Sequence, residues 1–501
     1  MMEKVSWTQA ALVAAGLALL CYIVSAAVAW YKLRHIPGPF FASFSYIWTS
    51  RAAFSGHIHS IMAAAHSKYG ETMRIGPDAI VVSDAETLLR INSARSPYVR
   101  SPWYGSLRLD HRGKNVLSEL DITTHSKRKA KLAPGFSGKN VTMLEARVDE
   151  WIGVLIRNIR ARIAKGGDIM DIGTVIAYFQ VDLVSSVELG KAWGDLEDDT
   201  DHFGFLEMSD AFVPIVQSLS FSPAARAIYT STWFMKLFGP KTTDTSGLGL
   251  FIGLLEKEVK SRFNDKTGKS HESEDILGEW MKHGLSESEC QQDLSLLVPA
   301  GSETSVMVVR GTLLLLMSSP VVYRKLKEQI KDAIASGLIS SPATNEEAKS
   351  LEYMQAVVRE GMRLMAPVNF GFPKRVPASG DTICGKYVPP GTDVYGNYFR
   401  MMRSKEIFGN DAEIFRPERF LGDGENVREM VKVVDLAFGG GRFMCLGKSL
   451  AVIELNKIFI ELLRNFDFQI ATPEKPWGKR GYISWMVHDF WARVTEDTTM
   501  R

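Results

Sequence analysis

Cysteine is scarce in this chain, which carries four in 501 residues: Cys21, Cys290, Cys384 and Cys445. Their spacings form neither a disulfide framework nor a CxxC metal motif, so we expect free thiols in a body that faces the cytosol. An excess of one charge is also lacking, because 59 Lys and Arg residues stand against 57 Asp and Glu, and they are spread along the chain. This balance argues against a nucleic-acid-binding protein.

Internal repeats and low-complexity stretches are lacking as well. What is present is an ordinary globular composition, with 46% hydrophobic and 23% charged residues. The chain is long enough to bury a large core, and its length alone is compatible with two or three domains.

One long uncharged run, Ala10–Trp30, lies near the N-terminus and spans about 30 Å as a helix. The alternative is a cleaved signal peptide, since Ala27-Val28-Ala29 resembles a cleavage site. The run is longer than a signal core, and Lys32 and Arg34 follow it, which favours an anchor with the body on the cytosolic side. The turn at Ile36–Pro39 then stops the helix. We therefore divide the chain into a short lumenal N-terminus (1–9), a transmembrane anchor (10–30), a proline-rich hinge (31–40) and a body (41–501).

Apolar residues of the body recur mostly at helical spacing. The predicted helices lie near 143–164, 174–190, 203–218, 249–264, 286–318 and 320–336. Two short strands are expected from Met73 to Ser83, and further strands past Phe370, as in Thr382–Val394. Polar stretches at Lys241–Gly247 and Asp265–Asp275 predict surface loops. The expected fold class is mainly α with a smaller β part.

The loop Phe438–Lys448 places Cys445 in a glycine-rich turn ahead of a predicted helix from Leu446 to about Leu463. Its three successive glycines let the backbone approach a flat group closely. A cysteine at a helix N-terminus meets unpaired N–H groups that favour the thiolate. Such a thiolate is a metal ligand or a nucleophile, and the alternative is a buried structural cysteine.

The longest predicted helix, about 286–318, opens with a capping box of Ser286 and Glu289. A proline in its middle predicts a kink or an opening. Glu303 and Thr304 lie beside that proline in an otherwise apolar stretch. We interpret them as a carboxyl and a hydroxyl that line a cavity and relay protons to a bound oxygen ligand. The alternative is a kinked core helix whose polar residues face solvent.

Three further charged residues predict a buried ion-pair triad. Glu360 and Arg363 are three residues apart, on one face of a helix. Arg419 lies in the segment Phe415–Phe420, which a proline makes rigid. A carboxylate that accepts from two guanidinium groups is hydrogen-bonded well enough to survive desolvation. Such a triad would fix two segments of the body against each other.

These motifs occur once each, in one order: Ala300-Gly-Ser-Glu-Thr304, Glu360-x-x-Arg363, Pro417-Glu-Arg-Phe420 and Phe438-Gly through Cys445-x-Gly447. Together they resemble the cytochrome P450 family, the haem-thiolate monooxygenases, over essentially the whole chain. The C-terminal part is most similar to fungal microsomal members of the pisatin demethylase-like and benzoate hydroxylase-like type. The resemblance implies a cytochrome P450 fold behind one N-terminal transmembrane helix.

The resemblance also implies haem b as cofactor, with Cys445 as the axial ligand of the iron. Further cofactor contacts are implied for Phe438, Gly439, Arg442, Gly447, His125, Lys129 and Arg375. Thr304 and Glu303 would be the catalytic pair at the bound dioxygen. Glu360, Arg363 and Arg419 would form the structural triad that holds the haem loop.

The chain departs from the family pattern around the haem propionates. The family usually has an arginine two residues before the cysteine, where this chain has Phe443. An earlier helix usually has a tryptophan and an arginine, where this chain has His125 and Lys129. Lys374 and Arg375 compete for the remaining propionate. The residues that pair the propionates are therefore left open.

The activity implied by the resemblance is insertion of one oxygen atom from O2 into an apolar small molecule, with hydroxylation as the default. Electrons would come from NADPH through NADPH-cytochrome P450 reductase. The basic residues that suit this acidic partner are Lys127, Arg128, Lys129, Lys131 and Lys448. The segments expected to contact substrate are Tyr104–Val116, 203–221, Leu297, Ala300, Pro367–Phe372 and Ile483–Met486. They contain Phe370, Phe372, Trp485 and one isolated polar group, Asn369, which predicts a mostly apolar pocket.

The expected substrate is a terpenoid, polyketide or aromatic compound of fungal secondary metabolism. The expected location is the endoplasmic reticulum membrane, with a single span and the catalytic body in the cytosol. Two alternatives stay open. One is a haem-thiolate isomerase or dehydratase without O2 activation, against which Glu303 and Thr304 argue. The other is a membrane haem-binding protein without turnover.

Overall fold

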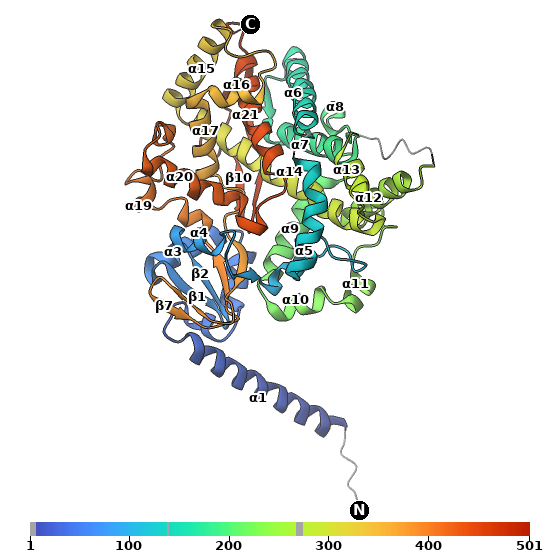
Figure 1. Ribbon diagram of the computed structural model, residues 1–501, viewed down its shortest axis with the longest axis vertical. Coiled ribbons are helices and arrows are strands. Elements are labelled where there is room, and N and C mark those ends of the chain that lie inside the picture. The colour runs from blue at the N-terminus through green and yellow to red at the C-terminus, as the bar shows by residue number, and fades with distance from the viewer. Residues whose placement is uncertain (1–6, 138–139, 267–273, 501) are drawn as a thin grey trace, which may run out of the picture.

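The computed structural model describes residues 7–137, 140–266 and 274–500. One long helix, α1 (Trp7–Leu33), projects from a body that contains the other elements (Figure 1). The strands β1 (Thr72–Gly76) and β2 (Ala79–Val82) lie at the end of the body from which α1 projects. The C-terminus lies at the opposite end (Figure 1).

Helices form most of the body. They are α2 (Ile47–Phe54), α3 (Ile58–Tyr69), α4 (Ala85–Ile91), α5 (Ile122–Leu132), α6 (Asn140–Ala164), α7 (Ile172–Leu189), α8 (Asp195–Asp198), α9 (Phe205–Ser220), α10 (Pro223–Tyr229), α11 (Thr232–Phe238), α12 (Gly247–Phe263), α13 (Ile276–Lys282), α14 (Glu287–Met317), α15 (Pro320–Ala335), α16 (Asn345–Ser350), α17 (Glu352–Leu364), α18 (Tyr398–Met401), α19 (Lys405–Phe408), α20 (Glu425–Asp435) and α21 (Lys448–Asn465). Short 3-10 turns connect some of them: η1 (Phe40–Ser43), η2 (Pro102–Leu107), η3 (Ala133–Phe136), η5 (Pro417–Phe420), η6 (Leu436–Phe438) and η7 (Gly441–Phe443).

The β part consists of small sheets. The remaining strands are β3 (Val99–Arg100), β4 (Ile169–Asp171), β5 (Gly371–Arg375), β6 (Asp381–Ile383), β7 (Lys386–Val388), β8 (Asp393–Gly396), β9 (Phe466–Ile470), β10 (Gly478–Gly481), β11 (Trp485–His488) and β12 (Trp491–Glu496). The largest sheet has the order β1-β2-β8-β5-β3, and β4-β12-β9 form another. β6 pairs with β7, and β10 pairs with β11. In the β3–β5 pair, Arg100 lies directly opposite Lys374.

Helix α14 runs through the middle of the body and packs against α7, α12, α15, α17 and α21 (Figure 1). Its start is fixed by the predicted capping box: the Glu289 N–H donates to Ser286 Oγ, and the Ser286 N–H donates to Glu289 Oε2. Buried apolar side chains from these helices form one contiguous core. α14 is therefore fixed on several sides, and it carries Glu303 and Thr304.

The predicted fold class, mainly α with a smaller β part, is confirmed. Each predicted helix overlaps an observed one, namely α6, α7, α9, α12, α14 and α15, and the predicted strand pair is β1 and β2. Part of the predicted loop at Asp265–Asp275 lies outside the described residues.

Two local predictions need correction. α14 is continuous across Pro299, so the predicted opening is not a break in the helix. α21 begins at Lys448 rather than Leu446, because Gly447 is its N-cap residue. Cys445 lies in the turn ahead of the helix, as predicted, and the helix begins two residues later than expected.

Three helices within the described ranges are long and apolar enough to cross a membrane: Ala15–Leu33 of α1, α7 and α14. α7 and α14 are largely buried within the body, whereas α1 is almost fully exposed. The Tyr22 hydroxyl in α1 donates to the Phe44 carbonyl at 3.1 Å, near the start of the body. The division at residues 9, 30 and 40 stays a prediction.

Candidate active site

Cys445 lies in the turn between η7 and α21, held by its own backbone. Its N–H donates to the Phe438 carbonyl at 2.8 Å, which closes the loop on itself. Cys445 is exposed to solvent. The protein atoms around its sulfur nevertheless remove part of the water that would stabilise a thiolate, and this raises the pKa of the thiol. The N–H groups of Gly447 and Lys448 point at Sγ and act in the opposite direction, as does the ammonium of Lys129. These donors are the ones that a thiolate ligand needs.

The glycines of the loop serve contacts within the protein. A Cβ on Gly440 would lie 2.5 Å from the Asn92 carbonyl oxygen, and one on Gly441 would lie 2.7 Å from the Ser93 carbonyl oxygen. Gly439 and Gly441 also have φ values of +68° and +55°, which side chains disfavour. Gly440 and Gly441 therefore let the loop pack against the residues that follow α4, and the predicted approach of the loop to a flat group stays a prediction.

Helix α5 is attached to the same loop. Lys129 Nζ donates to the carbonyl oxygens of Arg442 at 3.0 Å and Met444 at 2.6 Å. The Arg442 guanidinium is directed at the Ser96 carbonyl, at 3.5 Å. Both predicted cofactor residues thus have partners within the protein, and Lys129 is occupied by backbone carbonyls.

A group of basic side chains gathers beside the loop; we call Arg100, His125, Lys129, Lys374 and Arg442 the cation cluster. Arg100, His125 and Lys374 are buried, and within the described residues none of them forms an ion pair with a carboxylate. In the part of the chain that the structure describes, Arg100 Nε and His125 Nδ1 are buried without a hydrogen bond. Like charges directly opposite on paired strands are unfavourable, so the Arg100–Lys374 pair calls for an anion.

The pKa values of the cation cluster reflect the same lack of a negative partner. Burial lowers the pKa of Lys374 well below its usual value, and the charges of Arg100 and Lys129 add to that effect. Burial, together with the charges of the surrounding cations, lowers the pKa of His125 to about 3. A bound group with carboxylates would compensate these positive charges, and haem carries two propionates. The residues present therefore fit haem.

Phe443 lies at the centre of the cation cluster. Lys374 Nζ lies 4.0 Å from the centroid of its ring, and Arg100 Cζ lies 4.7 Å from it. The His125 ring centroid is 5.3 Å away. At these distances cation–π attraction holds both cations against the ring. Phe443 stands where the family usually has an arginine. It carries no charge, and its ring positions Lys374 and Arg100 instead.

Of the two residues predicted to compete for a propionate, the structure brings Lys374 into the cation cluster. Its neighbour Arg375 points to the other face of β5, where Nε pairs with Asp393 Oδ1 at 2.9 Å. Period-two alternation along the strand explains why only one of them faces the cluster. Arg100 was not predicted, because its only signal is its pairing across β3 and β5, which the sequence does not reveal.

Glu303 and Thr304 lie on α14, both half-buried. Thr304 Oγ1 donates to the Ala300 carbonyl at 2.8 Å, within the helix. Burial raises the pKa of Glu303, and Ser209 of α9 faces its carboxyl group. The charges nearby are Arg310, Asp210 and His488. The structure therefore places an acid and an alcohol side by side, with further titratable groups behind the acid.

The triad residues meet in the body, fully buried. Arg363 donates to both Glu360 oxygens, at 2.7 and 2.8 Å, and Arg419 Nε donates to Glu360 Oε1 at 3.0 Å. Their remaining N–H groups reach backbone carbonyls, including Met402 at 2.6 Å and Ala412 at 2.7 Å for Arg363. A buried carboxylate with two satisfied arginines fixes α17 against η5 and the segment before α20.

Among the residues expected to contact substrate, some have side chains that pack against or hydrogen-bond to the rest of the protein, and others do not. Phe370 stacks on Tyr395 with ring centroids 5.8 Å apart, within a core cluster, and the Trp485 indole N–H donates to the Ala366 carbonyl at 2.8 Å. Asn369 is fully buried, and its side-chain amide makes no hydrogen bond to the described part of the chain. Among Asn369, Phe370, Phe372 and Trp485, the free polar group is therefore Asn369, and Ser106, Ser209 and Ser218 of the other expected segments also have buried hydroxyls without a hydrogen bond in the described part of the chain.

The basic residues predicted to receive a redox partner are mostly committed elsewhere. Arg128 pairs with buried Asp293 at 2.6 Å, Lys131 donates to the Gly284 carbonyl at 2.8 Å, and Lys448 pairs with Asp435 at 2.9 Å. Lys127 is exposed. The predicted charge run is therefore partly structural.

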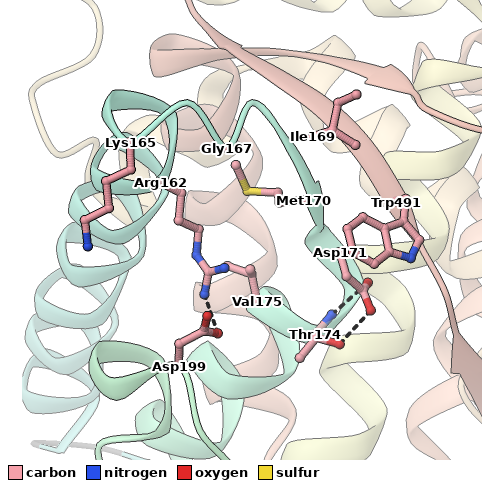
Figure 2. A pocket seen from close by; sticks show the side chains of 10 residues that line it. All are labelled: Arg162, Lys165, Gly167, Ile169, Met170, Asp171, Thr174, Val175, Asp199 and Trp491. Carbon is pink, nitrogen blue, oxygen red and sulfur yellow. Dashed lines mark hydrogen bonds and ion pairs between the residues drawn. The ribbon is translucent and has the colours of Figure 1, made fainter.

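Figure 2 shows a pocket of about 420 Å³ at the start of α7, outside the predicted site. Its lining residues are Arg162, Lys165, Gly167, Ile169, Met170, Asp171, Thr174, Val175, Asp199 and Trp491. Asp171 caps α7 by accepting from Thr174, and Arg162 pairs with Asp199 at 2.5 Å. These polar groups satisfy each other.

Comparison with known proteins gives a consistent result. The cytochrome P450 family model matches residues 35–482. The chain is 37% identical over 471 residues to the cytochrome P450 monooxygenase aba1 of Botryotinia fuckeliana (strain B05.10), covering 93% of this chain and 92% of that protein. It is 36% identical over 478 residues to ABA1 of Pyricularia oryzae (strain 70-15), covering 93% of each. Identity to abl1 of Leptosphaeria maculans is 35% over 482 residues, covering 94% of this chain and 84% of that protein.

Proposed function

The chain belongs to the cytochrome P450 family and is a P450 monooxygenase, and from this premise we propose that it hydroxylates an apolar small molecule. Membership implies haem, O2 and electrons from a redox partner. We further propose NADPH as the electron source, NADPH-cytochrome P450 reductase as the partner, and a substrate from fungal secondary metabolism. The fungal origin of the relatives supports the last point.

The observation that carries the proposal is an accessible thiol beside buried cations that lack carboxylate partners. Cys445 would ligate the haem iron, and Arg100, His125 and Lys374 would bind the propionates. We propose Lys374 in place of Arg375, because Arg375 pairs with Asp393. Phe438 and Gly439 would shape the loop under the haem, Gly447 would direct its N–H at the sulfur, and Lys129 and Arg442 would fix the loop.

When bound, the haem supplies oxygen activation, which thiolate ligation favours by promoting O–O cleavage. The protein's part is to hold and move protons on α14. Burial keeps Glu303 protonated to higher pH than a solvated carboxyl. Thr304 would turn its hydroxyl away from the Ala300 carbonyl, accept a proton from the Glu303 carboxyl group and release its own hydroxyl proton on the haem side of α14.

Substrate would be oriented by the one free polar group near Phe372. Asn369 has an unpartnered buried amide, which both donates and accepts, whereas its neighbours are apolar. A terpenoid, polyketide or aromatic compound with a carbonyl or hydroxyl group suits this arrangement. The isomerase or dehydratase alternative is not favoured, because such chemistry has no need for the acid and alcohol on α14.

For location we propose a single span, residues 10–30, in the endoplasmic reticulum membrane. α1 is exposed along its apolar length, unlike α7 and α14, which supports this assignment. Residues 1–9 would be lumenal, residues 31–40 would form the hinge, and the body 41–501 would face the cytosol, where its thiols stay reduced.

A carbon-monoxide difference spectrum of the reduced protein tests the proposal. The wild type should show the red-shifted Soret band of thiolate-ligated haem, and Cys445→Ala should lose it completely. Cys384→Ala, at another exposed cysteine, is the matched control and should keep it. A wild-type spectrum of the histidine-ligated kind would refute thiolate ligation. Expression of both variants with a reductase, followed by metabolite comparison, would then identify the substrate.

A further inference from the structure

A groove of about 1230 Å³ lies between the C-terminal part of α1 and the body; we call it the anchor groove. Its α1 wall runs from Tyr22 to Leu33. The wall on the body side comes from the segment 44–51, the turn at 77–78, the start of α10 and residues 389–392. Small-molecule sites in proteins measure roughly 300–1,000 Å³, so the anchor groove has room for a ligand larger than a typical metabolite.

Hydrogen bonds attach α1 to the body at both ends of the anchor groove. At one end, the Tyr22 hydroxyl donates to the Phe44 carbonyl at 3.1 Å. At the other end, the buried guanidinium group of Arg74 donates to the carbonyl oxygens of Trp30 at 3.4 Å and Ser43 at 3.0 Å. The groove is therefore enclosed between two points of attachment and belongs to the fold.

The dimensions of α1 suit a lipid in this groove. The helix has 27 residues, about 40 Å in length, whereas the hydrocarbon core of a bilayer is about 30 Å thick. A span that is too long tilts, and a tilted span leaves a wedge between itself and the body. From Tyr22 to Lys32 the groove follows α1 for ten residues (32 minus 22), about 15 Å, which is the hydrocarbon thickness of one leaflet.

Apolar side chains are exposed in and beside the anchor groove. Ile47 of α2 and Val28 of α1 line it, and they are 72% and 49% exposed. Phe40 and Phe41 of η1, just before the body wall, are 72% and 68% exposed. Single exposed apolar residues are common, but several together beside an apolar helix mark a surface that meets lipid or another apolar partner.

Two basic side chains in the lining have no carboxylate partner. Lys32 and Arg51 are both exposed, and neither forms an ion pair within the residues that the structure describes. The one carboxylate among the lining residues, Asp78, accepts a hydrogen bond from the Tyr46 hydroxyl. The lining therefore has two free cations and a net positive charge. Lysine and arginine are the side chains that bind phosphate groups.

We propose that the anchor groove binds an anionic glycerophospholipid, with its phosphate group between Lys32 and Arg51 and an acyl chain along Val28 and Ala29. The proposal rests on the proposed position of α1 in a membrane, which supplies the lipid. The net positive charge of the lining favours an anionic headgroup over a zwitterionic one. The bound lipid fills the space between the anchor and the body, so the two meet the membrane as one surface.

The alternative is that Lys32 and Arg51 only belong to the basic flank that a membrane span has on its cytosolic side. Arg34 offers a control for this alternative. It lies two residues after Lys32 but does not line the groove, and its Cζ lies 3.8 Å from the centroid of the Tyr31 ring. Arg34→Gln therefore removes the same charge from the same flank and leaves the groove intact.

The test uses the full haem-loaded chain in phosphatidylcholine nanodiscs that contain a minor share of phosphatidylserine. After transfer to detergent, native mass spectrometry counts the phospholipid that each protein retains. The wild type should retain one phosphatidylserine. Lys32→Gln and Arg51→Gln should each lower that retention by about fivefold, the effect of one cation near an anionic headgroup, whereas Arg34→Gln should not.

A second pair of variants tests the place of the acyl chain without a change of charge. Ala29 is half-buried and lines the groove, whereas Ala27 is exposed and does not. Ala29→Trp should fill the groove and abolish retention in a protein that keeps the wild-type circular dichroism spectrum. Ala27→Trp is the matched control, because it places the same indole on another side of α1, and it should retain the lipid.

Three results would overturn the lipid site. The first is an equal loss in Arg34→Gln, which would show attraction to the membrane surface alone. The second is equal retention of phosphatidylcholine and phosphatidylserine in all variants. The third is displacement of the lipid by inorganic phosphate, which would show a site for free phosphate. Alkaline carbonate extraction of membranes separates the two levels. If the chain stays in the membrane but the wild type retains no lipid, only the groove proposal fails. If the chain is released, the proposed position of α1 fails.

Discussion

The triad between α17 and η5 differs from the acid–alcohol region of α14 in how its polar groups are satisfied. In the triad, Glu360, Arg363 and Arg419 are buried, and the ion pairs between them measure 2.7 to 3.0 Å. On the α14 side, Ser209 Oγ is buried without a hydrogen bond of regular geometry in the described part of the chain, and the Asp210–His488 pair is half exposed at 3.5 Å. Buried polar networks that are fully satisfied rigidify a fold. We therefore expect the triad to stabilise the body more than the polar groups beside α14 do.

The largest test of this comparison removes the carboxylate of the triad. Glu360→Gln leaves the buried Arg363 without a counter-charge and leaves Arg419 with only the partly exposed Asp411, and we expect it to lower the free energy of unfolding by about 3–5 kcal/mol. Urea unfolding of the haem-loaded protein measures this change. Asp411→Asn is the control, because Asp411 also pairs with Arg419 but is partly exposed. Equal losses in the two variants would contradict a triad that is stabilised by burial.

The second test breaks the cation cluster. Lys374→Met should weaken haem binding by about thirtyfold, near 2 kcal/mol for a lost charged hydrogen bond. Transfer of haem to a scavenging protein measures the affinity. Arg375→Met, on the other face of β5, is the matched control and should retain haem. Greater haem loss from Arg375→Met would reverse the assignment.

The same variant has a pH signature in the haem-free protein. The pKa of Lys374 is lowered in the folded state, so the unfolded chain binds more protons between that lowered value and the usual value of 10.5. Stability of the wild type should therefore rise with pH through this window. Lys374→Met should flatten that rise, and bound haem should do the same by supplying carboxylates.

Thr304→Ala on α14 should change stability the least of these variants, while it should clearly change the use of oxygen. Thr304→Ala removes one hydrogen bond within the helix and should lower the free energy of unfolding by only about 1 kcal/mol. It should reduce productive oxygen use about tenfold, seen as hydrogen peroxide released per NADPH. Thr304→Ser should restore coupling. A large loss of stability with normal coupling would show that Thr304 has a structural role, like the triad residues, and no role in oxygen use.

Sequence predicted those features that depend on short spacing. The capping box of Ser286 and Glu289 and the Glu360–Arg363 pair each lie within one helical turn, so their contacts follow from helix geometry. Glu303 and Thr304 are consecutive residues, so their position on one long helix was predictable as well. The fold class followed from the periodicity of the long helices.

Features that depend on strand register or on distant contacts were not predictable. Arg100 faces Lys374 only because β3 pairs with β5, and the choice of Lys374 over Arg375 depends on which face of β5 turns inward. His488 meets Asp210 through packing of β11 near α9. Neither local propensity nor spacing encodes these contacts, because they are set by the tertiary fold.

The attachment of Lys129 to the carbonyl oxygens of residues 442 and 444 has a consequence for variation. The contact recognises the main chain alone, so any residue that keeps the backbone path is acceptable at position 444, whose side chain is exposed, whereas the side chain of Arg442 has its own partner in the Ser96 carbonyl. A library that randomises 444 should therefore yield many folded variants, whereas one at Gly440 or Gly441 should yield few. The loop that carries Cys445 thus tolerates change at an exposed side chain but not in its backbone.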